Sequence, residues 1–239
     1  MDATKVDAER AKTVLAEIVR EARGAGLLRP ATRTLVIRAL LGTAGLAALL
    51  AFAWTAESTP RALVAAALAG FACVQLGFIA HDAGHGSVGR SRLGNGIAGH
   101  LAFTLLNGLG FQSWRVSHDG HHAFCQDESR DPDMRVDVVM SLTAHSAEEK
   151  TGFGRALLPY QGYFLWPASL LFAGSLRLQS LARSYRAPAR YPGDVLLLPL
   201  HYAGWLVLPG LAFGVEAPRI TAVYLTCSAV IGLYLAVLF

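Results

Sequence analysis

The sequence is poor in charged residues and in cysteine. Asp, Glu, Lys and Arg make up 16% of its 239 residues, whereas a soluble domain has about 25%. The three cysteines are scattered and form no CxxC pair, so neither a disulfide framework nor a zinc ribbon is expected. Cys73 and Cys227 lie in apolar runs, where a free cysteine behaves as a small hydrophobic residue.

Other absences exclude classes of function. The sequence has no HExxH motif, which rules out a soluble metalloprotease of that type. It has no basic stripe with interleaved aromatic residues, so nucleic acid is not an expected partner. The formal net charge is only +4. The basic residues lie in the N-terminal segment and in loops, which fits contact with anionic lipid headgroups or with an acidic protein partner.

Long apolar runs dominate what is present. Hydrophobic residues make up 53% of the chain, and about 20 apolar residues in a row suffice to cross the ~30 Å core of a bilayer. Four runs qualify as spans: residues 35–54, 62–80, 195–215 and 220–239. We therefore expect an all-α integral membrane protein with about four transmembrane helices.

Two further uncharged stretches are interrupted. Residues 93–114 contain several glycines and two asparagines, and we expect a re-entrant or interfacial helix there. Residues 156–176 contain Pro159 and Pro167, so this stretch either spans the membrane or lies along its interface.

The N-terminal segment, residues 1–33, mixes acidic and basic residues and lacks the apolar core of a signal peptide. Residues 4–23 show an amphipathic helical pattern, typical of a helix on the membrane surface or of a solvated leader. Arginines concentrate in this segment and in two loops, so the positive-inside rule places the N-terminus and residues 115–190 in the cytosol. Residues 34–239 form the membrane domain.

Five of the eight histidines form two clusters. His81 and His85 are spaced i, i+4 directly after the second apolar run, and His118, His121 and His122 are spaced i, i+3, i+4. On helices, each cluster presents its rings on one face. Imidazole suits iron, zinc, copper and nickel, so we predict a metal site. A proton relay and a site that has lost its metal remain alternatives.

The motifs that carry a family resemblance are HDAGH and the longer segment SWRVSHDGHHAFCQDESRDPDMR. In order, spacing and placement they resemble the HxxxH and HxxHH histidine boxes of the membrane fatty acid desaturases. Many members continue the second box with an Asp-Pro-Asp element, matched by residues 131–133. The resemblance runs from about residue 30 to the last residue.

The resemblance implies a cytosolic helical cap on the four spans, with a diiron centre held by the histidine boxes. Iron and dioxygen would then remove two hydrogens from an unactivated acyl chain. Residue by residue, the metal ligands would be His81, His85, His118, His121 and His122. Asp82 and Asp119 would orient imidazoles, or simply cap and solvate helix ends. His100 is a possible extra ligand, whereas His145 and His201 are expected to be structural.

The implied substrate is an acyl lipid or an acyl thioester. No cytochrome b5-like segment or ferredoxin-like cysteine set is seen, so electrons would come from a separate ferredoxin or cytochrome b5-like donor. A basic surface could steer such an acidic carrier, or its arginines could reflect positive-inside topology alone. It would lie near Arg90, Arg92, Arg183 and Arg186. We expect residence in a bacterial plasma membrane, with both histidine boxes in the cytosol.

One element of the family pattern is absent. The family has a third HxxHH box after the fourth span, and this sequence contains none. We therefore expect a C-terminally incomplete desaturase with weak or no activity alone. Two alternatives stay open: a related histidine-box hydroxylase or ketolase acting on lipids or carotenoids, and a non-catalytic fragment that binds a lipid or a partner subunit.

Overall fold

The computed structural model describes residues 3–134 and 140–238, and these residues contain helices and connecting turns without a β-strand. The elements up to the second histidine cluster are α1 (Ala3–Gly24), α2 (Thr32–Thr55), α3 (Thr59–Gly84), α4 (Arg92–Gly99), the π-helix η1 (His100–Asn107) and α5 (Phe111–Phe124). The middle of the chain holds the 3₁₀ turn η2 (Pro132–Met134), α6 (Ala144–Glu149), α7 (Gly152–Leu157), the 3₁₀ turn η3 (Leu158–Tyr160), α8 (Gln161–Ser169) and α9 (Phe172–Arg186). The last elements are α10 (Pro192–Tyr202), the π-helix η4 (Ala203–Val207), α11 (Leu208–Phe213) and α12 (Ala217–Leu238).

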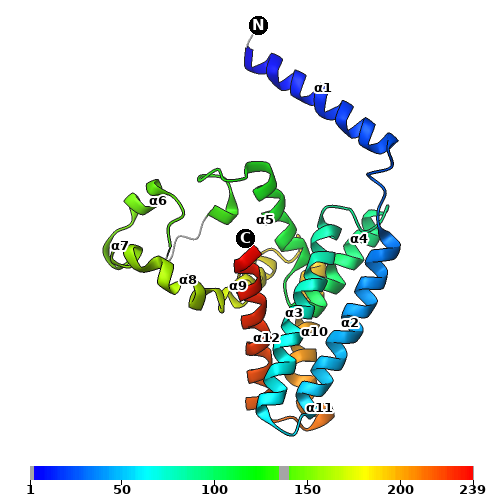
Figure 1. The fold of residues 1–239 in the computed structure, drawn as a ribbon, viewed down its shortest axis with the longest axis vertical. Coiled ribbons are helices and arrows are strands. Elements are labelled where there is room, and N and C mark those ends of the chain that lie inside the picture. The colour runs from blue at the N-terminus through cyan, green and yellow to red at the C-terminus, as the bar shows by residue number, and fades with distance from the viewer. Residues whose placement is uncertain (1–2, 135–139, 239) are drawn as a thin grey trace.

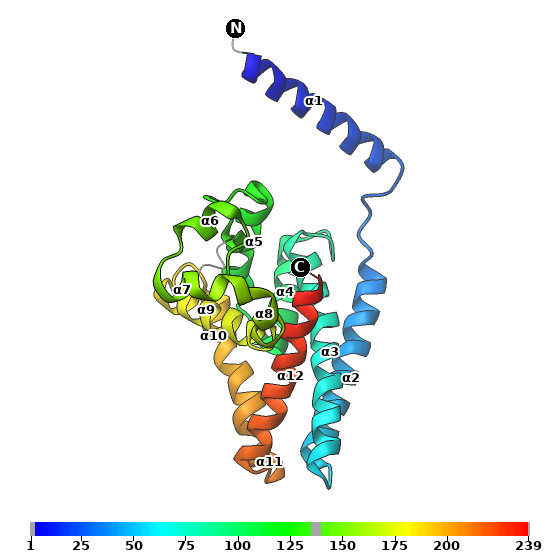
Figure 2. The same ribbon diagram turned by 60° about the vertical axis from the view of Figure 1, so that its left-hand side comes forward.

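Four helical segments are long and apolar enough to cross a membrane, and they form one bundle (Figure 1). They are α2, α3, the continuous segment Pro192–Phe213, and α12. The predicted all-α membrane fold with four spans is confirmed. The shorter helices α5 to α9 gather at the end of the bundle opposite α11, and α1 extends away from it (Figure 2).

Helix α3 lies at the centre of the bundle and packs against both α2 and α12. Its buried face consists mainly of small residues such as Ala62, Ala66 and Ala69, which let helix backbones approach closely. At Gly70 an added Cβ would lie 2.7 Å from the Cys227 carbonyl oxygen and 2.9 Å from Val230 Cβ. This close approach fixes the register of α3 against α12.

The second span is longer than the apolar run that predicted it. Helix α3 continues through His81 to Gly84, because a helix ends where capping and packing end it and not where hydropathy falls. The helix therefore carries His81 within its last turn, and His85 occupies the C-cap position.

Residues 93–114 form two helices with a sharp break between them. Helix α4 continues into η1, and the chain then turns at Gly108, which has a φ of +69°. An added Cβ at Gly108 would overlap the His201 ring, so the turn needs glycine for both its backbone angle and its space. The break directs the following helix, α5, back toward the end of α3.

Residues 156–176 do not form a single spanning helix. Helix α8 ends at Ser169 and α9 begins at Phe172. Gly232 of α12 lies against this break, where an added Cβ would be 3.2 Å from the Ala173 amide nitrogen. Tyr163 and Trp166 on α8 are exposed, which suits aromatic side chains at headgroup depth.

Candidate metal centre

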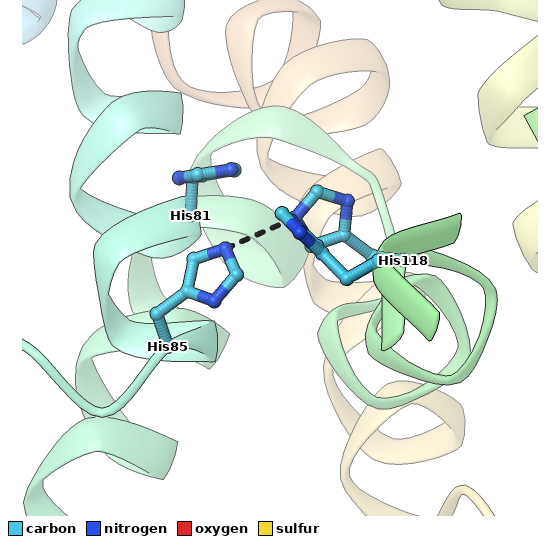
Figure 3. Close-up of side chains that lie close together, drawn as sticks. His81, His85 and His118 are labelled. Carbon is cyan, nitrogen blue, oxygen red and sulfur yellow. Dashed lines mark hydrogen bonds between the residues drawn. The ribbon is translucent and has the colours of Figure 1, made fainter. Parts of the chain in front are cut away.

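Two helices bring the two histidine clusters together. His81 and His85 come from the end of α3, and the second cluster lies on α5 (Figure 3). The ring centroids of His81 and His118 are 4.8 Å apart, and those of His85 and His118 are 5.1 Å apart. The i, i+4 spacing within each cluster places the rings on the facing sides of these helices, as the sequence predicts.

Four imidazoles each offer a nitrogen within 4.8 Å of the others: those of His81, His85, His118 and His122. His118 is the hub of this four-histidine group. Its Nε2 is 3.1 Å from Nε2 of His85 and 3.1 Å from Nε2 of His122. Nitrogens at such separations can share one cation, since metal–imidazole bonds are about 2.0–2.1 Å long.

Burial and repulsion from neighbouring histidines favour the neutral form of two of these rings, those of His118 and His85. Burial, and then the neighbouring histidines, lower the pKa of His118 to about 4. Burial, with His81 and His122, also lowers the pKa of His85. A metal requires the neutral imidazole with a free lone pair. The donor chemistry of the four-histidine group therefore fits a transition-metal ion.

Aromatic packing orients the hub. The Trp114 ring stacks on His118 with centroids 4.4 Å apart and an interplanar angle of 20°. Trp114 in turn packs edge-to-face with Phe103, at 4.8 Å. Gly84 leaves room for the indole, because an added Cβ would lie 2.9 Å from Trp114 Cζ3.

His121, the remaining member of the second cluster, faces a different set of partners. Its Nδ1 is 3.0 Å from both carboxylate oxygens of Asp131, and its Nε2 is 3.9 Å from Cys125 Sγ. The structure therefore brings four of the five predicted ligands into one group and places His121 in a neighbouring group with Cys125 and Asp131.

The N-terminus of α5 is held from another helix. Asp194 at the start of α10 is fully buried and accepts hydrogen bonds from the backbone N–H groups of Gln112 (3.0 Å) and Ser113 (2.8 Å). The side chain of Gln112 in return accepts from the backbone N–H of Gly193, at 3.0 Å. Each helix thus supplies a cap for the first turn of the other.

The possible extra ligand His100 belongs to this capping region. Its Nδ1 contacts Thr104 Oγ1 at 3.0 Å and lies 3.7 Å from Asp194 Oδ1. Burial lowers the pKa of His100, and the Asp194 charge offsets this only in part. His100 is not a member of either group of candidate ligands among the described residues.

The two carboxylates that were predicted to orient imidazoles, Asp82 and Asp119, lie at the edge of the four-histidine group and are not members of it. Asp82 Oδ1 is 3.7 Å from His81 Nδ1, and Asp119 Oδ2 is 3.6 Å from Arg115 Nε. The histidines expected to be structural have other partners. His201 is buried between the Leu105 carbonyl and the Tyr224 hydroxyl, and exposed His145 pairs with Glu149.

The arginines considered as a docking surface differ in their surroundings. Arg183 is half-buried and donates to the Ser113 carbonyl at 2.9 Å, so it helps to hold α5. Arg90, Arg92 and Arg186 are exposed.

Sequence reasoning did not identify Cys125 or Asp194 as residues of this region. It named Asp131 in the Asp-Pro-Asp element but did not predict its contact with His121. Cys125 lies four residues after His121, so helical spacing alone could have placed it beside that ring. Asp131 lies in the Asp-Pro-Asp element, but only the turn that follows α5 places it against His121. No local signal identifies Asp194, which lies more than 80 residues along the chain from Gln112 and Ser113, whose N–H groups it caps.

Comparisons with known proteins agree on one family. The fatty acid desaturase family model matches residues 58–239. The chain is 30% identical over 130 residues to the acyl-lipid (9-3)-desaturase of Borago officinalis, covering 50% of this chain and 29% of that protein. It is 37% identical over 103 residues to the Delta 8-(E)-sphingolipid desaturase of Kluyveromyces lactis, covering 43% and 17%.

The match to the Delta(8)-fatty-acid desaturase of Helianthus annuus is 25% identical over 130 residues, covering 50% of this chain and 28% of that protein. The alignments thus span less than a third of each of these relatives. No solved structure gives a significant match.

Proposed function

Because the chain belongs to the fatty acid desaturase family, we propose that it takes part in introducing a double bond into a lipid acyl chain at a histidine-ligated iron centre. The convergence of four imidazoles at the end of a spanning helix carries this proposal. Such a donor set suits iron, and its place at the end of α3 puts the chemistry beside the apolar bundle.

The four-histidine group would hold iron, with His121 as a further candidate ligand. Iron bound there supplies, with dioxygen, the oxidising power needed to remove two hydrogens from an unactivated acyl chain. The protein orients the donors: α3 and α5 carry the rings, Trp114 stacks on His118, and Asp194 fixes the start of α5.

The substrate we propose is an acyl lipid or an acyl thioester, in keeping with the acyl-lipid, fatty acid and sphingolipid desaturases among the relatives. Electrons would come from a separate ferredoxin or cytochrome b5-like donor. The positive-inside rule supports a cytosolic location for the histidine end of the bundle.

Iron content and lipid products test this proposal together. Detergent-purified protein should contain iron, and His118→Ala should lower its iron affinity at least about tenfold, since changing even the partners of metal-binding histidines costs 10–100-fold. The matched control is His145→Ala, which removes an exposed histidine on α6 and should leave iron content unchanged.

Mass spectrometry detects any unsaturated acyl chains gained by membranes that contain the wild-type chain and an electron donor, and we expect a low yield because the sequence has no third histidine box. Addition of an oxygen atom in place of a double bond would assign the chain to hydroxylation or ketolation. Iron binding that is equal in the wild-type and His118→Ala chains would refute the four-histidine group as the centre.

A further inference from the structure

A small polar cavity lies between α5 and the residues that lead into α10. We propose that this cavity, the Arg115–Arg190 pocket, binds the phosphodiester group of a membrane phospholipid. Its volume is about 230 Å³. Its polar lining consists of Gln112, Arg115, Asp119, Arg190 and Tyr191, and its apolar lining of Phe111 and Val116. None of these residues belongs to either group of candidate metal ligands, so the proposal does not depend on the proposed function.

The two arginines leave their guanidinium donors available. Arg190 has no carboxylate partner within the described part of the chain, and its guanidinium carbon lies 5.5 Å from the centroid of the Tyr191 ring. Arg115 Nε lies 3.6 Å from Asp119 Oδ2, which is too long for a hydrogen bond. Each guanidinium presents five N–H donors in a planar arrangement that matches phosphate oxygens.

The hydroxyl of Tyr191 is the group that points to a ligand. The residue is 4% exposed, yet its hydroxyl has no hydrogen-bond partner among the residues that the structure describes. A buried tyrosine hydroxyl usually has a partner, because a buried donor without one is costly. Tyr191 lines the pocket together with Arg190, and a phosphate oxygen bound there would accept this hydrogen bond.

Charge and volume favour one anionic group of a larger molecule. Two guanidinium groups and one carboxylate line the pocket, so its net charge is +1. This charge matches the single negative charge of a phosphodiester. The pocket is also smaller than the about 300–1,000 Å³ of sites that enclose a drug-sized ligand. It therefore suits the phosphate of a lipid whose remaining parts stay outside.

The position of the pocket selects a membrane lipid as the source of this phosphate. Tyr191 directly precedes Pro192, the first residue of the spanning segment Pro192–Phe213. Arginine and tyrosine at the end of a spanning helix lie at the depth of lipid headgroups. Val116 is 43% exposed beside the arginines, which gives the glycerol and ester region of the lipid an apolar surface to contact.

Native mass spectrometry of the detergent-purified chain tests the proposal with phosphatidylglycerol and with diacylglycerol, which has the same acyl chains but no phosphate. We expect the wild-type chain to bind phosphatidylglycerol more tightly. Arg190→Gln and Tyr191→Phe should each weaken this binding about tenfold, the lower end for a hydrogen bond to a charged group. Tyr191→Phe should leave the melting temperature unchanged, because the hydroxyl that it removes has no partner in the described chain. The matched control is Arg92→Gln, an exposed arginine outside the pocket, which should bind both lipids as the wild type does.

Asp119→Asn should act in the opposite direction. It removes an exposed negative charge beside Arg115, so phosphatidylglycerol should bind about 1.5- to 5-fold more tightly. Equal binding of the two lipids by the wild type would overturn the proposal, as would unchanged phosphatidylglycerol binding in Tyr191→Phe. Inorganic phosphate that binds as tightly as phosphatidylglycerol would also overturn it, since the pocket would then be a general anion site.

An acidic ferredoxin serves as the probe for a protein partner. If Arg190→Gln weakens binding of the ferredoxin and leaves phosphatidylglycerol binding intact, the arginines form a protein-docking surface and the lipid proposal is wrong. No outcome of these experiments involves iron content, so a failure here differs from a failure of the proposed function.

Discussion

Replacing Asp194 by asparagine should loosen the helix that carries the second histidine cluster. Asp194 accepts two backbone N–H groups in the first turn of α5 and the hydroxyl of Ser184, all in a buried setting. Asparagine keeps one acceptor oxygen and turns its NH₂ group toward the other donor. An unsatisfied buried donor costs about 1–3 kcal/mol, and loss of the charge at a helix N-terminus adds about 1 kcal/mol. We expect α5 to lose about 2–4 kcal/mol of local stability.

Hydrogen exchange of the α5 amides measures this effect directly. A loss of 2–4 kcal/mol corresponds to exchange about 30- to 900-fold faster at these amides, with weaker cobalt binding by the four-histidine group. Asp119→Asn is the matched control, since Asp119 lies on the same helix, is exposed and pairs with the Arg115 side chain. Its effect should stay within about 0.5 kcal/mol. Equal protection of α5 in the two variants would refute the capping argument.

Two further predictions concern the break after η1 and the crowded hub. Gly108→Ala should lower the thermal stability more than Gly86→Ala. Both glycines have positive φ, which costs an alanine about 1–2 kcal/mol, but only at Gly108 would the new Cβ meet a buried ring, that of His201. Equal melting temperatures would contradict this. The pKa of His118, lowered to about 4, rises to about 6.5 on unfolding, so the unfolded chain binds more protons between these values. The free energy of unfolding of the metal-free protein should therefore decrease as the pH falls from 6.5 toward 4. Thermal unfolding in chelator checks the slope, and His118→Asn should flatten it.

The sequence was sufficient for the spans and for the faces that the paired histidines share. Long apolar runs predict membrane helices because the bilayer leaves few other structures for such segments. Spacing of i, i+4 predicted that His81 and His85 share a face, and that His118 and His122 do so too. Only the family resemblance predicted that these two pairs converge, because no local sequence pattern indicates that α5 packs back against the end of α3.

The features that the sequence did not predict depend on tertiary contacts. The direction of His121 is set by Asp131, which reaches the ring through a left-handed residue, Gln126. The capping of α5 by Asp194 joins residues that only the folded chain brings together. The helical extension of α3 past its apolar run follows from packing at its polar end, for which hydropathy gives no signal.

The close approach at Gly70 holds α3 at one position against α12, and the length of the helix then fixes the position of His81. The helix is continuous from Gly70 to His81, a length of about 16 Å at 1.5 Å per residue. A slip of one residue against α12 would move the His81 ring 1.5 Å along the helix axis and turn it by about 100°. The packing register of α3 at Gly70 therefore determines where the His81 nitrogen atoms lie at the end of the same helix. A methyl group added at Gly70 would shift α3 against α12 and so displace the His81 ring, although it makes no contact with that ring.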